Sequence, residues 1–194
     1  MVMCVLKLVH GCRAACLSTA GRGKFSNVKE ARLRKTKLFF EDRATFLKQL
    51  EQDIALFAKY CEQNKIKAYV RLNGTSDISW EKYGIFEKFP QVQFYDYTKV
   101  HNRKVSHLSN YHLTYSRSED SSDADLTKAL NSGMNVAVVF HKELPVKWVI
   151  NSKEIPVING DTNDLRPLDP KQSIVGLVSK GDAKKDSSGF VIYC

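Results

Sequence analysis

The chain lacks the long apolar run that a membrane-spanning helix requires. Among its 194 residues, no stretch approaches the ~20 consecutive apolar side chains of a transmembrane span. The first residues, MVMCVLKLVHGC, are mildly apolar with one lysine. They lack the charged segment and long apolar segment of a secretory signal peptide. We therefore expect a cytoplasmic protein without a membrane partner.

Several common site motifs are also missing. The sequence has no GxGxxG dinucleotide fingerprint, no phosphate-binding Gly-Lys-Ser loop and no serine nucleophile elbow. Its five histidines form no HExxH-type zinc pair. His112 falls inside an expected strand and is interpreted as a core histidine. There is no internal repeat. These absences exclude the commonest nucleotide, hydrolase and zinc-protease signatures.

The charge balance is strongly basic. The formal net charge is +9, while the hydrophobic content of 43% and the charged content of 26% are ordinary for a globular protein. The length predicts a single domain over residues 1–194. A basic protein is compatible with nucleic acid or another polyanion as partner. The early basic residues form either a solvated face or a polyanion contact: Lys24, Lys29, Arg32, Arg34, Lys35 and Lys37.

Residues 27–63 are expected to form one long helix that follows a cysteine-containing segment, 1–26. Asn27 and Glu30 have the spacing of a capping box. Apolar residues then recur at helical intervals, at Leu38, Phe39, Phe46, Leu47, Leu50, Ile54, Leu56 and Phe57. We expect Phe39, Phe46, Leu50 and Phe57 to pack inward, and Arg32 and Lys35 to stay in water.

Strands and helices alternate after this helix. Strands are expected at 66–72, 91–97, 110–115, 134–140, 155–159 and 173–178, and a further one at 2–9. A short helix or turn is expected in DISWEKYGIFEKF, and a helix at 121–133 closed by Gly133. This order predicts an α/β fold with parallel pairing. The strands are too few for a full eight-stranded barrel, so we expect a partial (β/α) barrel or a curved open, mostly parallel sheet with one long N-terminal helix.

Polar side chains follow each expected strand, where a parallel sheet forms its site. The candidate binding residues at this edge are Asn73, Asp77, Asp96, Lys99, Ser116, Arg117, Glu119, Asp161, Asp164 and Arg166. Asp161, Asp164 and Asp169 have the oxygen ligands that Mg²⁺ or Ca²⁺ prefers, in a spacing unlike a calcium loop. Simpler interpretations are an Asp164–Arg166 ion pair, and Asp77 and Trp80 starting a helix.

Cysteines form one cluster in the sequence. Cys61 and Cys194 stand alone and are interpreted as single buried or terminal thiols, whereas Cys4, Cys12 and Cys16 lie close together. Three thiolates are able to bind an iron–sulfur cluster and leave one iron open for S-adenosylmethionine. The alternative is that Cys4 faces the core of a first strand and the other two pack at a helix start. The spacing alone leaves both interpretations open.

Seven blocks of the sequence resemble a known family. GCRAACLSTAGRG, RLNGTSDISWE, FPQVQFYDYTKV, NYHLTYSRSE, NVAVVF, VINGDTNDLRPLDP and GDAKKDSSGFVI together resemble the uncharacterised phage family called gene product 88. That family is remotely similar to radical S-adenosylmethionine proteins, a similarity that implies a partial (β/α) barrel with a cluster bound after the first strand. This sequence departs from the pattern at Cys4, which is followed by Val5 instead of proline.

The resemblance, the basic charge and the acidic edge lead to one functional hypothesis each. The first is a phage-encoded, radical S-adenosylmethionine-like iron–sulfur protein of unknown substrate, with Cys4, Cys12 and Cys16 as cluster ligands. In it, Lys99 and Arg117 pair with a carboxylate of the ligand. The second is a non-catalytic basic protein that binds nucleic acid or a host factor. The third is a Mg²⁺-dependent hydrolase or transferase that uses the acidic edge.

Overall fold

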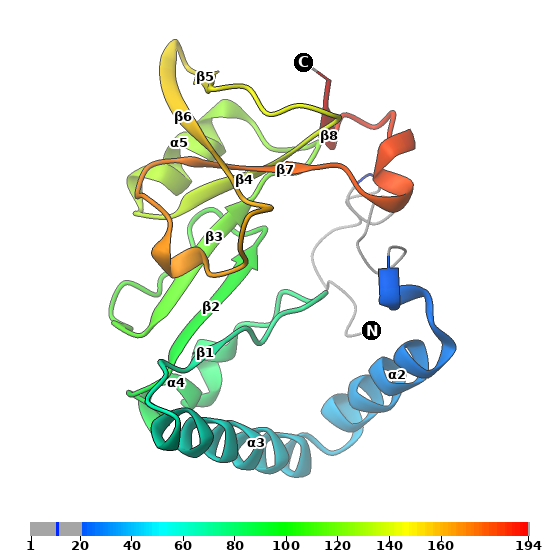
Figure 1. Ribbon diagram of the computed structural model, residues 1–194, viewed down its shortest axis with the longest axis vertical. Helices are drawn as coiled ribbons and strands as arrows, with labels where there is room; N and C mark the ends of the chain where they lie inside the picture. The colour runs from blue at the N-terminus through cyan, green and yellow to red at the C-terminus, as the bar shows by residue number, and fades with distance from the viewer. Residues whose placement is uncertain (1–10, 12–20, 194) are drawn as a thin grey trace.

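The fold is an open, mostly parallel sheet with helices before and between its strands. In the computed structural model, which describes Gly11 and residues 21–193, the strands pair in the order β1-β2-β3-β4-β7-β6-β5, and β8 lies beside β4 (Figure 1). The pairing of β5 with β6 is antiparallel, and the other pairings are parallel. The predicted α/β class and parallel pairing are therefore confirmed, in the form of an open sheet.

The strand bounds follow the sequence expectation at most positions. The strands are β1 (Tyr69–Val70), β2 (Gln93–Thr98), β3 (Tyr111–Ser116), β4 (Asn135–Phe140), β5 (Lys147–Ile150), β6 (Lys153–Asn159), β7 (Ile174–Val178) and β8 (Val191–Ile192). The strand predicted at 66–72 is wrong in length, because beyond Val70 the N–H of Asn73 bonds to a side chain, Asp96. β5 and β8 were not predicted. The strand expected at 2–9 lies outside the described residues.

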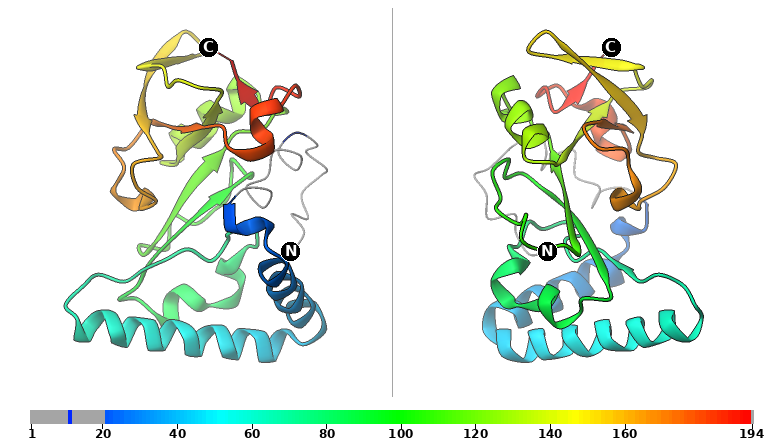
Figure 2. Two further views of the ribbon diagram at one scale, coloured as in Figure 1. Left: turned by 45° about the vertical axis from the view of Figure 1, so that its right-hand side comes forward. Right: turned by 90° about the vertical axis from the view of Figure 1, so that its left-hand side faces the viewer.

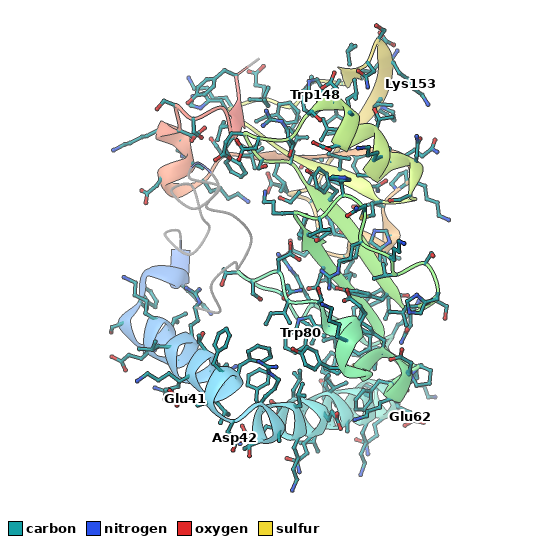
Figure 3. The ribbon with its side chains drawn as sticks, turned by 180° about the vertical axis from the view of Figure 1, so that it is seen from behind. Glu41, Asp42, Glu62, Trp80, Trp148 and Lys153 are labelled. Atoms are coloured by element: carbon teal, nitrogen blue, oxygen red, sulfur yellow. The ribbon has the colours of Figure 1, made fainter. Side chains whose placement is uncertain are left out.

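The first long helix is two helices. α2 (Ser26–Glu41) and α3 (Arg43–Gln63) meet at Asp42, whose φ of −141° and ψ of 75° are not helical. The side chain of Asp42 accepts a 3.1 Å hydrogen bond from the N–H of Thr45 and so caps α3. Asp42 lies at the junction where the two helices change direction (Figure 3). The prediction of one helix over 27–63 is therefore wrong.

The capping box predicted at Asn27 and Glu30 is also wrong. Phe25 occupies the N-cap position of α2 without a side-chain hydrogen bond, and Asn27 accepts only from the neighbouring N–H of Val28. A capping box does occur in α5 (Asp123–Asn131), where Ser122 and Asp125 exchange hydrogen bonds. The helix expected at 121–133 is thus confirmed. It closes as expected near Gly133, whose φ of +89° favours glycine.

The remaining helical elements are short. They are η2 (Gly21–Lys24), η3 (Trp80–Tyr83), α4 (Ile85–Lys88), η4 (Arg166–Leu168) and η5 (Gly181–Lys185). The turn or short helix expected in DISWEKYGIFEKF is present as η3 and α4. Within the described part of the chain, no helix is both long and apolar enough to cross a membrane.

The inward side of α3 differs from the expected one. Ile54, Ala58 and Cys61, spaced four and three residues apart, are buried in the main core. Phe57 lies off this stripe and is 40% exposed, so its predicted inward position is wrong. Phe39 is buried as expected and contacts Phe46 and Trp80 (ring centroids 5.3 and 5.8 Å apart). Leu50, which was expected to pack inward, is half-buried. Arg32 is also half-buried, although it was expected to be in water, and Lys35 is exposed as expected.

Elements cover both faces of the sheet. Phe94, Leu113 and Val136 belong to the same core as residues of α3, α4 and α5. On the opposite face, η4 packs beside β2 and β3, and Ala183 of η5 joins a second apolar cluster with Val191. Figure 2 shows α5 and η4 on opposite sides of the sheet. The sheet is therefore covered on both faces, and the carboxyl ends of its parallel strands share one edge.

Candidate functional site

Asn73 and Asp96 are joined at the carboxyl end of β1. The N–H of Asn73 donates to Oδ1 of Asp96 at 2.6 Å, and its Nδ2 donates to Oδ2 at 3.3 Å. The hydroxyl of Tyr111 also donates to Oδ2, at 3.1 Å. Asp96 is fully buried, and burial raises its pKa to about 7 despite these donors. Burial and the neighbouring carboxyl likewise raise the pKa of Tyr111, which keeps its proton for this hydrogen bond.

The carboxamide of Asn73 organises the NGTSD stretch. Its Oδ1 accepts from Ser76 Oγ at 2.8 Å, from the N–H of Ile78 at 3.0 Å and from Nε1 of Trp80 at 3.0 Å. Trp80 is thereby held between the sheet and the N-terminal helices, where its ring stacks on Phe46 (Figure 3). Asn73 and Asp96 therefore fix the loop that carries Asp77.

Asp77 connects this loop to the end of β2. Its Oδ2 accepts from the hydroxyl of Thr98 at 3.1 Å and from the N–H of Lys99 at 2.7 Å. Its Oδ1 pairs with Arg103 at 3.0 Å, and both side chains are about 5% exposed or less. Burial raises the pKa of Asp77 against these favourable contacts. Although Trp80 does start η3, Asp77 is a member of a buried charge network.

Arg103 is the centre of that network, and it was not predicted as a site residue. Its Nε and Nη2 donate to the two carboxylate oxygens of Glu81 at 2.9 and 2.5 Å, and Nη2 also donates to the carbonyl of Ile78 at 2.9 Å. Burial alone would raise the pKa of Glu81, but the hydrogen bonds and charge of Arg103 outweigh burial and lower it. Arg103 and Glu81 lie in polar stretches far apart in the sequence, and neither carries a recognisable motif.

Lys99 and Arg117 lie together beyond β2 and β3. The ammonium of Lys99 donates to Oγ of Ser116 and to the carbonyl of Arg117, both at 2.9 Å, and lies 5.2 Å from the ring centroid of Phe190. Nη1 of Arg117 donates to the carbonyls of Gly189 and Phe190 at 2.8 and 3.1 Å. Burial lowers the pKa of Arg117 from its high ordinary value. This part of the edge therefore holds two fixed cationic groups.

Gly11 and Glu119 adjoin the same edge. The N–H of Gly11 donates to Oε1 of Glu119 at 2.6 Å, and Gly11 is buried. A Cβ at Gly11 would clash with the side chain of Ser188, so a larger residue there would require Ser188 to move. The other carboxylate oxygen of Glu119 is buried without a hydrogen-bond partner among the described residues. Gly11 immediately precedes Cys12 in the sequence.

Asp161, Asp164 and Arg166 form a separate group after β6. Asp161 pairs with Lys180 at 2.6 Å and accepts from the N–H of Val178 at 2.8 Å. Arg166 is fully buried, and its guanidinium pairs with Asp169 at 3.3 Å. Its contact with Asp164 is a backbone hydrogen bond, in which the N–H of Arg166 donates to the carbonyl of Asp164. The predicted Asp164–Arg166 ion pair is therefore wrong. The guanidinium of Arg166 instead binds the Gly160 and Asn163 carbonyls within its own loop.

The expected metal-binding carboxylates do not converge. Among the residues that the structure describes, no three His, Cys, Asp or Glu side chains are placed to hold a metal ion. Lys180 and Arg166 neutralise Asp161 and Asp169. His112 lies in β3, where burial lowers its pKa and favours the neutral ring. Its interpretation as a packed histidine of the sheet agrees with this position.

The cysteines divide between described and undescribed residues. Cys61 is a free thiol in α3, and at 2% exposure it belongs to the core, as predicted. Cys4, Cys12, Cys16 and Cys194 lie outside the described residues. The cluster prediction therefore rests on the sequence and on the position of Gly11.

Fold and site together define an α/β protein with a mostly parallel open sheet and a hydrogen-bonded polar network at the carboxyl ends of its first strands. The chain matches the family model described as Gene product 88 over residues 4–194, and it belongs to this family. No curated protein matches the chain. No solved structure matches it either. The predicted family is thus confirmed, whereas the similarity to radical S-adenosylmethionine proteins stays a prediction.

Proposed function

We propose that the chain is a phage-encoded iron–sulfur protein of the radical S-adenosylmethionine type, with its site at the carboxyl ends of β2 and β3. One observation carries the proposal. Gly11, the residue before Cys12, donates a 2.6 Å hydrogen bond to Glu119, just beyond β3. Gly11, which directly precedes the Cys12–Cys16 pair in the sequence, therefore lies beside Glu119, two residues after Arg117.

The donor set suits such a cluster. Cys4, Cys12 and Cys16 supply three thiolates, and soft thiolate ligands favour iron–sulfur clusters. When bound, a three-thiolate cluster supplies one-electron chemistry through an iron position left open for S-adenosylmethionine. The described residues contain no competing cluster of metal-ligating side chains.

The cationic groups at this edge would orient the ligand. Lys99 has an ammonium fixed by Ser116, by the Arg117 carbonyl and by the ring of Phe190. The backbone N–H of Lys99 is anchored by buried Asp77. Lysine and arginine pair with carboxylates such as that of the methionine portion of the cofactor. The buried network therefore sets the position of the groups that would bind the ligand.

The acidic-edge alternative has less support. A Mg²⁺-dependent hydrolase or transferase needs several carboxylate oxygens directed at one point. Asp161 and Asp169 are instead each engaged by a cation, Lys180 and Arg166 respectively.

Anaerobic reconstitution with iron and sulfide tests the cluster. Wild-type protein is expected to take up iron and gain the visible absorption of an iron–sulfur cluster. Cys12→Ala should lose both, whereas Cys61→Ala, which alters a buried thiol of α3, should keep both. Equal iron content in the wild type and Cys12→Ala would show that Cys12 is not a ligand and would end the radical interpretation.

Calorimetric titration of the reconstituted protein with S-adenosylmethionine tests the ligand site. Lys99→Gln should weaken binding by about tenfold, the scale of a lost charge-assisted hydrogen bond. Lys180→Gln is the matched control, because Lys180 pairs with Asp161 in the separate group. If both variants bind as tightly as wild type, the ligand does not contact Lys99.

A further inference from the structure

The outer side of α2 alternates basic and apolar side chains. Lys29, Leu33, Lys37 and Phe40 follow one another at spacings of four, four and three residues, which place them on a single stripe of α2, and Phe25 occupies the N-cap position directly before the helix. We call these five residues the α2 stripe. Phe25, Leu33 and Phe40 are 58%, 53% and 54% exposed, and both lysines are exposed. The stripe therefore displays large apolar groups between positive charges.

Positive charge also surrounds this stripe. Arg34 and Lys35 are exposed on other sides of α2, and Arg22 is exposed in η2. Within the part of the chain that the structure describes, Lys29, Arg34, Lys35 and Lys37 take part in no ion pair. The helix has no acidic residue in its first turn, and its only two carboxylates, Glu30 and Glu41, are outnumbered by its basic residues. Figure 2 shows α2 at the periphery of the molecule, apart from the strands.

We propose that the α2 stripe binds single-stranded nucleic acid. Lysine side chains neutralise phosphates, and exposed aromatic rings stack on unpaired bases, which is the usual combination in single-strand binding. Lys29 and Lys37 lie about 12 Å apart along the axis at ~1.5 Å per residue, so they reach two separate phosphates of one strand. Phe25 and Phe40 flank them and offer ring faces to bases.

The distribution of apolar groups favours this occupant over a lipid surface. A helix that lies on a membrane gathers its apolar residues on one face and its basic residues on the other. On α2, apolar and basic residues alternate along the same stripe, and Arg34 and Lys35 extend the positive charge around the helix. Burying Phe25, Leu33 and Phe40 in lipid would take Lys29 and Lys37 into the apolar layer with them.

Fluorescence anisotropy with a labelled single-stranded oligothymidine tests the proposal. The double variant Lys29→Gln, Lys37→Gln should bind on the order of tenfold more weakly at ~0.1 M salt. The slope of the logarithm of its binding constant against the logarithm of salt concentration should be smaller by about 1.4, because each lost phosphate contact lowers this slope by ~0.7. The control is Lys142→Gln, Lys153→Gln, which removes the same charge from exposed positions near β4 and β6. If the two double variants weaken binding equally, the α2 stripe is not the binding site.

Stacking is tested separately from charge. Phe25→Ala should weaken oligothymidine binding at least about fivefold with an unchanged salt slope, because stacking on a base contributes ~1–3 kcal/mol. Phe57→Ala, which alters a 40% exposed ring of α3 off the stripe, should have no effect. Circular dichroism confirms that each variant folds. Equal binding by Phe25→Ala and wild type overturns the stacking contact.

Vesicles containing phosphatidylserine provide the competing ligand. The proposal expects no sedimentation of the protein with these vesicles at a salt concentration where oligothymidine binds. Vesicle binding that depends on Lys29 and Lys37, together with no binding of oligothymidine, would overturn the proposal in favour of a membrane surface. Neither result depends on the presence of an iron–sulfur cluster.

Discussion

The backbone N–H of Asn73 donates a 2.6 Å hydrogen bond to the carboxyl group of Asp96, a residue on the neighbouring strand that is fully buried. The N–H of Asn73 thus bonds to a side chain and makes no strand-to-strand hydrogen bond, and β1 has already ended at Val70. This contact turns the chain away from the sheet and into the loop that carries Asp77. A buried carboxyl thus determines where the first strand ends and where the charged network begins.

Asp96 makes stability depend on pH in a characteristic direction. Its pKa of about 7 in the folded protein exceeds the ordinary value of 3.8, so folded protein keeps a proton that unfolded protein releases between these values. The free energy of unfolding contributed by Asp96 therefore falls as pH rises from about 4 to about 7 and stays low above it. Asp96→Asn removes this dependence.

Denaturant titrations of both proteins at several pH values measure the effect. Relative to Asp96→Asn, wild type is expected to lose on the order of 1–4 kcal/mol between pH ~4 and ~8. Taking the difference between the two proteins cancels the titration of other carboxyls. A difference that is the same at every pH would show that Asp96 ionises normally in the fold.

Arg103 should be among the most sensitive charged residues. Arg103→Met leaves Asp77 and Glu81 without their cation in a largely buried site, and removing one partner of a buried pair costs ~3–5 kcal/mol. Lys147→Met is the control, because the Lys147–Glu154 pair is 58% and 61% exposed and should contribute less than ~1 kcal/mol. Chemical unfolding compares the two. Similar losses in both variants would argue against a buried network.

Phe46 joins the helices to the sheet layer through Trp80. Its ring stacks on Trp80 at 6.3 Å and meets Phe39 edge to face at 5.3 Å, although Phe46 itself is only half-buried. Phe46→Ala is expected to lower the free energy of unfolding by about 2–3 kcal/mol, below the full cost of a core phenylalanine. Phe57→Ala should cost less than ~1 kcal/mol. The prediction fails if the two substitutions are equivalent in a denaturant titration.

The helix break at Asp42 is testable through its cap. Asp42→Ala removes the acceptor for the Thr45 N–H and should cost about 1 kcal/mol, whereas Asp42→Ser keeps an acceptor and should cost less. Asn27→Ala removes the residue that the sequence pattern favoured as a cap, and the structure predicts a loss below ~0.5 kcal/mol. Thermal unfolding of the three variants ranks them. A larger loss at Asn27 than at Asp42 would support a single continuous helix.

The apolar strands were the most predictable part of the fold. NVAVVF and SIVGLV are nearly continuous apolar runs, the pattern of a strand covered on both faces, and they form β4 and β7. β8 escaped prediction because it is short and gains its place by pairing with β4, a strand distant in the sequence. β5 is a short, largely exposed strand that pairs with β6, the next strand along the chain. Helical periodicity continues across Asp42, so the apolar pattern carried no sign of the break.

The candidate site was predictable in part for a related reason. Residues directly after strands, such as Asn73 and Lys99, could be placed because parallel strands end at one edge. Arg103 could not, since its partners Asp77 and Glu81 belong to another loop and no motif links them. Asp96 did leave a signal, a single carboxylate between the aromatic residues of FYDY, which indicates a buried acid.

The position of β8 has a consequence for how the chain folds. β4 pairs with β3 through Asn135, Val136 and Ala137. Along the same edge of β4, Val139 and Phe140 pair with β8, which comes near the end of the described residues. Until Val191 and Ile192 have been synthesised, these apolar positions present an unpaired strand edge, the kind of surface that associates with other chains. During translation the nascent protein therefore exposes a strand edge that is prone to associate with other chains. Folding of this part of the sheet is complete only when contacts between residues distant in the sequence have formed.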